Sequence, residues 1–232
     1  MPRQAEGDDL LASISYFAGL DAAALSELKR AVRRRRHTDG EQILAEGASC
    51  EGLFFVIEGQ VRLVRASPDG REQVLGVLGP GATFNDIAVF DAGPNSDSAV
   101  AVGPTTVGLV PRRDMMALVE KYPQVAQAAL KLLSARQRSL TGVVEDLALR
   151  DVTQRVARLL LGCIGRQPHM IEKAEAACAH ITHQEIASMV GSVREVVQRA
   201  LKSLESDGAI KVERNRVQIR DAAKLERWAG SE

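Results

Sequence analysis

The sequence predicts an α+β protein with an N-terminal β-barrel of the jelly-roll type, one long helix, and a C-terminal unit of short helices followed by a β-hairpin. Short apolar runs separated by glycines fill residues 38–112, as in a β-sandwich or barrel. Apolar residues then recur at helical spacing over 123–148. Two short helical segments with a glycine between them follow within 182–205, and "GAIKVERNRVQIRD" reads as a hairpin with Asn215 near its tip.

The composition is that of a soluble globular protein. The 232 residues are 45% hydrophobic and 26% charged, enough for one large or two modest domains. The formal net charge is zero, but residues 152–232 carry 13 Lys and Arg against 10 Asp and Glu. No apolar run approaches the roughly 18 residues of a membrane span, and "MPRQAEGDD" is no signal peptide. Cys50, Cys163 and Cys178 are too few and too scattered for a disulfide framework, so we expect a cytoplasmic protein.

Residues 10–36 predict a helical lead-in to the barrel. Asp21 is a suitable N-cap for a helix over 22–32. Arg33 to Arg36 would then form a solvated helix end, where positive charge suits the helix dipole, although such a run also fits a nucleic-acid patch. Within the barrel, Asp69-Gly70 predicts a hairpin between two alternating strands.

The long helix begins at Pro123 and carries an apolar seam at alternating spacings of three and four residues. This is the a/d pattern of a coiled coil, and it predicts a homodimer interface. Packing of the helix on its own barrel is the alternative. Asp151 is a suitable N-cap for the next helix, which makes 148–151 a natural hinge. The predicted interface consists of Leu130, Leu133, Gln137, Leu140, Val144 and Leu147.

The two short C-terminal helices have the spacing of a helix–turn–helix. Thr182 is predicted to cap a helix over 183–190, with Glu185 as its capping-box partner. Gly191 makes the turn, and Ser192 is predicted to cap the second helix, with Glu195 three residues later. Such a unit places its second helix in the major groove of DNA. A small apolar core would join the two helices: Ile186, Val190, Val197 and Leu201.

The second helix begins with side chains that suit base edges. Arg194 and Arg199 match guanine, and Glu195 can accept from cytosine N4. Gln198 and Val196 are further candidates, the latter against a thymine methyl group. A solvated face with an internal Arg–Glu pair is the alternative. Phosphate or hairpin contacts are expected from Thr182, Ser192, Lys202, Arg214 and Arg216.

These features resemble the cyclic-AMP receptor protein / fumarate-nitrate-reduction regulator (Crp/Fnr) family of bacterial transcription factors. The match is most specific in "DVTQRVARLLL" and "ITHQEIASMVGSVREVVQRALKSLE". The resemblance implies a homodimer that binds double-stranded DNA at a palindrome with TGTGA-like half-sites, and that contacts RNA polymerase if it is an activator. It also implies a cyclic-nucleotide-binding-like sensory domain over 1–122, a dimerisation helix and hinge over 123–150, and a winged-helix DNA-binding domain over 151–232.

The sensory pocket departs from that of the family members that bind cyclic nucleotides. Asn85-Asp86 stands where a Gly-Glu pair is expected, and Ser96-Asp97 stands where an Arg-Ser pair is expected. A carboxylate therefore replaces the cation that would pair with the cyclic phosphate. Leu140 aligns with a threonine that contacts the base. Cyclic AMP is not expected to bind this degenerate pocket, formed by Phe84, Asn85, Asp86, Ile87, Ser96, Asp97, Leu140 and Thr141.

The cofactor stays unknown. Residues 1–49 contain no cysteine, which excludes the N-terminal iron–sulfur cluster of some relatives. "TFNDIAVFDAGPN" has a loose similarity to the nitric-oxide-responsive haem branch of the family. Haem is therefore left open, with His37, Cys50 or Pro2 as the available axial ligands.

Neither a metal site nor an enzyme is predicted. No nucleophile–base set or carboxylate pair has a recognisable spacing. A regulatory subunit that acts on a protein partner remains the alternative to a DNA-binding regulator. Several histidines and cysteines gather in the C-terminal half, but without the short fixed spacings of zinc ligands: Cys163, His169, Cys178, His180 and His183.

Overall fold

The computed structural model describes residues 10–67, 72–164, 171–172, 181–213 and 216–230. The chain divides into two compact units. The first unit comprises Met1–Val64 and Leu78–Arg136, and the second comprises Arg65–Val77 and Gln137–Glu232. None of the helices in the described ranges combines the length and apolar character of a bilayer-spanning segment.

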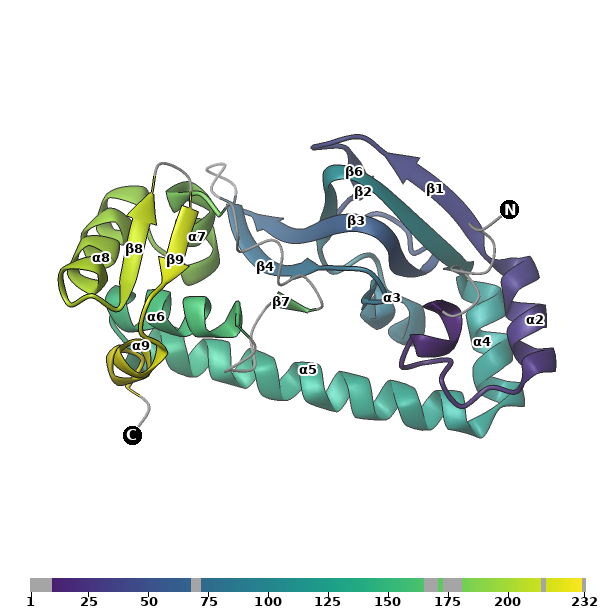
Figure 1. The fold of residues 1–232 in the computed structure, drawn as a ribbon. Helices are drawn as coiled ribbons and strands as arrows, with labels where there is room; N and C mark the ends of the chain where they lie inside the picture. The colour runs from purple at the N-terminus through teal and green to yellow at the C-terminus, as the bar shows by residue number, and fades with distance from the viewer. Residues whose placement is uncertain (1–9, 68–71, 165–170, 173–180, 214–215, 231–232) are drawn as a thin grey trace, which may run out of the picture. The chain divides into compact units, whose positions relative to one another are not determined.

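The first unit is built around an antiparallel sheet, which agrees with the predicted β-barrel (Figure 1). Within this unit the neighbouring strands run in the order β1-β6-β3, with β2 on β6 and β5 on β3. The tip of the β3–β4 connection, with Asp69-Gly70, lies outside the described residues. The strands of this unit are β1 (Arg33–His37), β2 (Gln42–Leu44), β3 (Gly52–Ala66), β5 (Thr83–Phe84) and β6 (Ser98–Pro111). Strand β7 (Ile171–Glu172) and all but the last residue of β4 (Glu72–Leu78) belong to the second unit.

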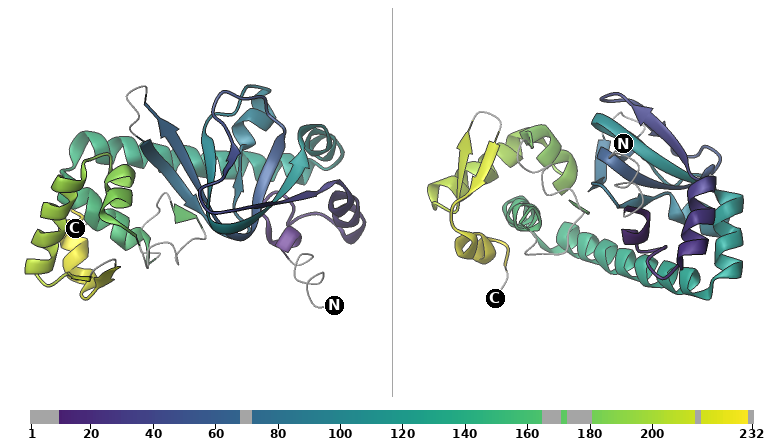
Figure 2. Two further views of the ribbon diagram at one scale, coloured as in Figure 1. Left: turned by 90° about the horizontal axis from the view of Figure 1, so that it is seen from above. Right: turned by 45° about the vertical axis from the view of Figure 1, so that its right-hand side comes forward.

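Alternation along the strands gives the sheet two apolar faces. The interior face includes Phe54, whose ring stacks on Phe84 with centroids 5.2 Å apart. The exterior face includes Phe55 and is covered by helices, with α2 and α4 next to one another in Figure 2. The helices of this unit are α2 (Ala22–Ala31), α3 (Asp86–Asp91), α4 (Arg112–Lys121) and the first part of α5 (Pro123–Leu149).

The predicted cap of α2 is confirmed, but the predicted end of this helix is wrong. Asp21 accepts a hydrogen bond from the Ala24 N–H at 2.8 Å. Lys29 and Arg30 occupy the last turn of α2, and Arg33 to Arg36 form strand β1 instead of a helix end. Pairing of β1 with β6, which begins at Arg33 opposite Leu109, decides this conformation. That pairing is non-local and leaves no trace in the local charge pattern.

The second unit consists of the last part of α5, the short helices predicted from the sequence, and a β-hairpin. Asp151 caps α6 as predicted, so the break between the long helix and the next one lies at 150–151. Asn215, predicted near the hairpin tip, lies outside the described residues. The remaining elements are α6 (Val152–Gly162), α7 (His183–Val190), α8 (Arg194–Ser206), β8 (Ile210–Glu213), β9 (Arg216–Ile219) and α9 (Ala222–Trp228).

The cysteines differ in chemical state. Cys50 has a free thiol, whereas Cys163 at the end of α6 is disulfide-bonded. The sequence argument excluded a disulfide framework, and it did not foresee this single bonded cysteine. Spacing along the sequence does not measure how close two sulfur atoms lie in the fold.

Candidate nucleic-acid interface

Helix α7 begins and ends as the sequence predicts. Thr182 and Glu185 form a reciprocal capping box, with Glu185 N–H donating to Thr182 Oγ1 at 3.2 Å and Thr182 N–H donating to Glu185 Oε2 at 2.8 Å. Gly191 ends α7 in the left-handed region with φ of 62°. A Cβ at Gly191 would lie 3.0 Å from Leu147 Cδ2. Both the backbone conformation and the close approach of α5 therefore favour glycine at this turn.

The predicted cap of α8 is wrong. Val193, not Ser192, is the N-cap, and no side chain caps the helix. The Ser192 N–H donates to the Ala187 carbonyl at 3.0 Å, so the residue still belongs to the end of α7. The shift by one residue also moves Glu195 from the third to the second position of α8. The first-turn N–H groups of α8 are consequently left without a side-chain acceptor.

One face of α8 is buried and the other is exposed. The buried face packs in the core of the second unit through Val197, Ala200, Leu201 and Leu204. Figure 1 shows α8 beside α7 and the β8–β9 hairpin, an arrangement typical of a winged helix. The opposite face, with its long polar side chains, is therefore directed away from this core.

The predicted base-reading side chains lie on the exposed face. The side chains of Arg194, Glu195, Gln198 and Arg199 are exposed and make no hydrogen bond or ion pair with any described residue. The internal Arg–Glu pair of the alternative interpretation is thus absent among the described residues. Val196 is half-buried.

The residues predicted to contact phosphates are only partly described by the structure, and not all of them are exposed. Thr182 and Lys202 are exposed and Ser192 is half-buried. The Thr182 hydroxyl is already used in the capping box of α7. Arg216 is the first residue of β9, and Arg214 lies outside the described residues.

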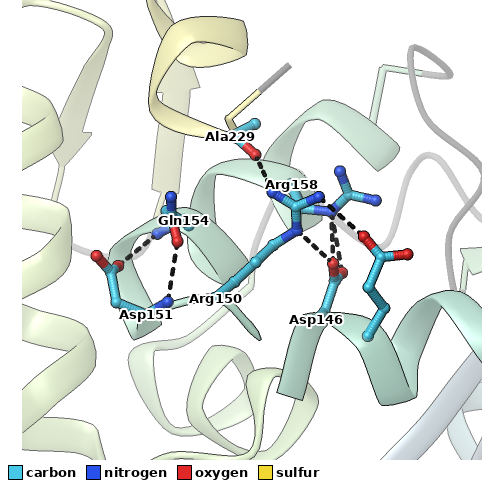
Figure 3. Close-up of polar contacts among 7 residues, drawn as sticks. Asp146, Arg150, Asp151, Gln154, Arg158 and Ala229 are labelled. Carbon is cyan, nitrogen blue, oxygen red and sulfur yellow. Dashed lines mark hydrogen bonds and ion pairs between the residues drawn. The ribbon is translucent and has the colours of Figure 1, made fainter. Parts of the chain in front are cut away.

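Sequence reasoning missed the network that fixes these helices to the end of α5 (Figure 3). The Asp146 carboxylate accepts from Arg150 Nε at 2.8 Å and from Arg158 Nε at 3.0 Å. Arg150 Nη1 also donates to the Ala229 carbonyl at 3.0 Å. One carboxylate thereby joins α5 and α6, and Arg150 adds a contact to the residue after α9. The i,i+4 spacing of Asp146 and Arg150 was the available sequence signal.

A second missed residue supports the glycine turn. Arg155 on α6 donates from Nη1 to the Val190 carbonyl at 2.7 Å. Val190 is the last residue of α7, directly before Gly191. The bond satisfies a helix-end carbonyl and holds the turn in place.

In the first unit, the predicted pocket centres on a buried carboxylate. Asp86 is 3% exposed, and its Oδ2 accepts from the Tyr16 hydroxyl at 2.9 Å and pairs with Arg136. Its Oδ1 accepts from the Ile87 N–H at 3.1 Å. Arg136 also donates from Nη2 to the Thr83 carbonyl at 2.5 Å. Both carboxylate oxygens are therefore engaged by groups of the protein itself.

The other residues of the predicted pocket differ in their surroundings. Ser96 Oγ donates to Asp97 Oδ2 at 2.8 Å. Asn85 has φ of 66°, and its Nδ2 donates to the Gly52 carbonyl at 3.2 Å. Phe84 belongs to the interior core, whereas Ile87 is 47% exposed. Only part of the predicted set thus forms one cluster.

The predicted seam on α5 is largely exposed in the single chain. Leu130 is 68%, Leu140 58%, Val144 65% and Leu147 51% exposed. Gln137 is also exposed and Leu133 is half-buried. Val125 and Ala129 are the residues of this helix that are buried within the chain. Thr141 Oγ1 bonds to the Gln137 carbonyl of its own helix at 3.1 Å.

Comparison with known proteins matches both halves of the chain. Residues 34–122 match the cyclic nucleotide-binding domain, and residues 154–228 match the Crp-like helix-turn-helix domain. Over 222 residues the chain is 31% identical to the CRP-like cAMP-activated global transcriptional regulator of Mycobacterium tuberculosis, covering 96% of this chain and 99% of that protein. The chain belongs to the Crp/Fnr family.

Other Crp/Fnr proteins agree with this assignment. The cyclic AMP receptor protein of Thermus thermophilus is 33% identical over 197 residues, 85% of this chain and 88% of that protein. The crystal structure of the Thermus thermophilus catabolite activator protein is 32% identical with a TM-score of 0.53, and covers 94% of this chain and 100% of that one. As a Crp/Fnr protein, the chain is a DNA-binding transcription regulator and not an enzyme.

The candidate haem ligands His37 and Cys50 lie far apart in the first unit. His37 pairs with Thr105 in the middle of β6, and Gly52 pairs with Pro111 at its end, six residues and roughly 20 Å further along the strand. Cys50, two residues before Gly52, therefore cannot share one iron with His37. Burial also raises the pKa of the Cys50 thiol, which opposes the thiolate form that binds iron. Pro2 lies outside the described residues.

The histidines and cysteines of the C-terminal half form no metal site within the described part of the chain. No group of three or more His, Cys, Asp or Glu side chains gathers there. His169, Cys178 and His180 lie outside the described residues.

Proposed function

We propose that the protein is a homodimeric regulator that reads a palindrome with TGTGA-like half-sites. The observation that carries this proposal is the set of exposed side chains at the start of α8, which have no partners among the described residues. Arg194 and Arg199 suit guanine O6 and N7, and Glu195 suits cytosine N4. Gln198 and Val196 extend the contact to adenine and a thymine methyl group.

Contacts with the phosphates of the DNA backbone would set the register of α8 on the duplex. We assign them to Ser192, to Lys202 and to the hairpin arginines at 214 and 216. The Thr182 hydroxyl contributes while it remains in its capping box. The uncapped N–H groups at the start of α8 provide a further phosphate contact, because the positive end of the helix dipole lies there.

Dimerisation is proposed to occur through α5. A row of leucine and valine side chains at a/d spacing, more than half exposed, is an unpartnered apolar surface that a second copy would cover. The chain is then organised as a sensory domain (1–122), a dimerisation helix and hinge (123–150) and a winged-helix domain (151–232). Such a regulator acts in the cytoplasm, and as an activator it would also contact RNA polymerase.

The sensory pocket is proposed not to bind cyclic AMP, in contrast to the relatives whose names include this ligand. Asp97 stands beside Ser96 where the phosphate needs a cation, and Asp86 already receives bonds from Tyr16 and Arg136. A haem-dependent regulator remains the second candidate within the family. It would need an iron ligand other than a His37–Cys50 pair.

DNA binding at two salt concentrations tests the proposal. A labelled TGTGA palindrome should bind tightly at low salt, and log Kd should rise steeply with log salt because phosphate contacts release counterions. A scrambled duplex should bind at least about a thousandfold more weakly. Equal affinity for both duplexes would contradict sequence-specific reading, and binding that ignores salt would contradict DNA binding through phosphates.

A further inference from the structure

A groove of about 890 Å³ lies on the first unit, away from the Asp86 cluster. Strands β1, β3 and β6 form its sides, and Leu10 of the N-terminal helical turn closes part of it. Its volume falls within the range of small-molecule sites in proteins. The groove is lined by Leu10, Arg34, Arg36, His37, Thr38, Ile57, Glu58, Pro104, Thr105 and Thr106.

Strand alternation sorts the four arginines of β1 onto two faces. Arg35 faces the barrel interior, where it bonds to Glu51 at 2.5 and 3.1 Å and lies 5.9 Å from the centre of the Phe54 ring. Arg34 and Arg36 therefore share the opposite face, on which the groove lies. Their Cα atoms are roughly 7 Å apart, as for any residues i and i+2 of a strand.

The two groove arginines lack counter-ions. Neither Arg34 nor Arg36 makes an ion pair or a side-chain hydrogen bond with any described residue, whereas Arg35 is neutralised by Glu51. Across the sheet, Arg36 pairs with Thr106 and Thr106 pairs with Glu58, which is the single acidic residue lining the groove. No ion pair joins Glu58 to either arginine. Among the described residues, two neighbouring positive charges therefore face the same space without an acidic partner.

His37 lies on the same face of β1 as Arg35, opposite to the face of Arg34 and Arg36. Its side chain is 10% exposed, and its Nδ1 lies 2.8 Å from Glu41 Oε1. Its Nε2 is buried and has no partner among the described residues.

We propose that this groove binds a phosphate-bearing small molecule of nucleotide size. Arg34 and Arg36 hold the phosphate, because guanidinium groups bind phosphate oxygens in bidentate fashion. Leu10, Ile57 and Pro104 provide an apolar surface for a ring, and Glu58 accepts from hydroxyl groups. The inference is independent of the proposed DNA contacts, which lie on the other unit of the chain.

Calorimetric titration of the full-length protein with pyrophosphate and with AMP tests the site, with adenosine as the probe that lacks phosphate. We expect both phosphate compounds to bind and adenosine to bind at least about tenfold more weakly. The double variant R34A/R36A should lose binding of both by about tenfold or more. Each single variant should lose part of this affinity, which keeps the test decisive if the double variant folds poorly.

Two controls separate the groove from other cationic surfaces. Arg33→Ala removes a charge from the same strand on the opposite face, and R194A/R199A removes charge from α8. Both should bind the probes like the wild type. Unchanged pyrophosphate binding in R34A/R36A, an equal loss in Arg33→Ala, a loss confined to R194A/R199A, or no binding by the wild type at millimolar probe would overturn the proposal.

Discussion

At the scale of single residues, function depends on side chains that the fold leaves unpaired. Arg194, Glu195 and Arg199 lie on α8, and their side chains make no hydrogen bond or ion pair with any described residue. Asp86 is the opposite case, because every oxygen of its carboxylate is engaged. Free polar groups on a rigid element are ready for an external partner, whereas saturated ones are not.

Arg194→Ala should weaken binding to the TGTGA palindrome by about 1–3 kcal/mol, because a bidentate guanine contact is lost. Discrimination against a substituted guanine should fall at the same time. Fluorescence anisotropy with matched and substituted duplexes measures both effects. Lys202→Ala is the control, since a phosphate contact should weaken all duplexes alike. An Arg194→Ala profile that matches this control would remove base reading from Arg194.

Gly191→Ala should lower the free energy of unfolding by roughly 1–3 kcal/mol, because the left-handed backbone and the contact with Leu147 both oppose a Cβ. Gly40→Ala is a matched control, with φ of 74° and no atom within 4 Å of its added Cβ. Urea denaturation compares the two variants. An equal loss in both would show that backbone conformation, and not the packing against α5, accounts for the effect.

At the scale of elements, α5 has three parts with different surroundings. Its N-terminal part is buried through Val125 and Ala129, its seam residues are exposed, and its C-terminal end carries the Asp146 network. One helix can thus attach to a sheet, offer a surface to a second copy and anchor the helices that follow it. The seam and the Asp146 network can be tested separately, each by its own substitution.

Leu140→Asp combined with Val144→Asp should convert the protein to a monomer, because two carboxylates cannot be buried in an apolar seam. Sedimentation velocity should show the lower mass, and affinity for the full palindrome should fall while half-site binding persists. Arg138→Asp introduces the same charge at a neighbouring position outside the seam and should remain dimeric. A dimeric double variant would place the interface elsewhere.

Asp146→Ala should destabilise the second unit by about 1–3 kcal/mol, because two arginines lose their shared, 14%-exposed carboxylate. Glu145→Ala removes only a 53%-exposed partner of Arg150, so its cost should be about 0–1 kcal/mol. Thermal unfolding followed by circular dichroism distinguishes them. Equal melting temperatures for both variants would mean that the network contributes no more than a surface ion pair.

At the scale of the whole molecule, the chain combines a DNA-binding half typical of the family with a sensory half that departs from the family pattern at Ser96 and Asp97. Residues 154–228 match the Crp-like helix-turn-helix domain, and residues 34–122 match the cyclic nucleotide-binding domain but carry Ser96-Asp97 where an Arg-Ser pair is expected. We therefore expect DNA binding to be regulated by a signal other than cyclic AMP, or to need no signal.

Cyclic AMP should give no binding heat with the full-length protein at millimolar concentration, because Ser96 stands at the position expected for the phosphate-binding arginine and the Asp97 carboxylate opposes the phosphate. DNA affinity should likewise be unchanged when the nucleotide is added. A micromolar isotherm would refute the interpretation of Ser96 and Asp97. Titration calorimetry and anisotropy provide the two measurements.

Local signals predicted local structure well. The caps at Asp21, Asp151 and Thr182 depend on contacts three residues apart, so the sequence contains them. The strand at Arg33–Arg36 and the uncapped start of α8 depend on β6 and on the end of α7, which the local pattern does not encode. The link from Asp146 to Arg158 and the Arg155–Val190 bond cross between helices and were missed for the same reason.

The arginine run in β1 has a consequence for storage and expression. β1 ends the strand order of the described sheet, so one row of its backbone N–H and C=O groups is open to a foreign strand. Consecutive positive charges repel an identical strand and keep that row hydrated. With valine in place of these arginines, the edge strand could pair with an identical strand of a second molecule. The resulting fibrous aggregates would be visible as turbidity in concentrated samples.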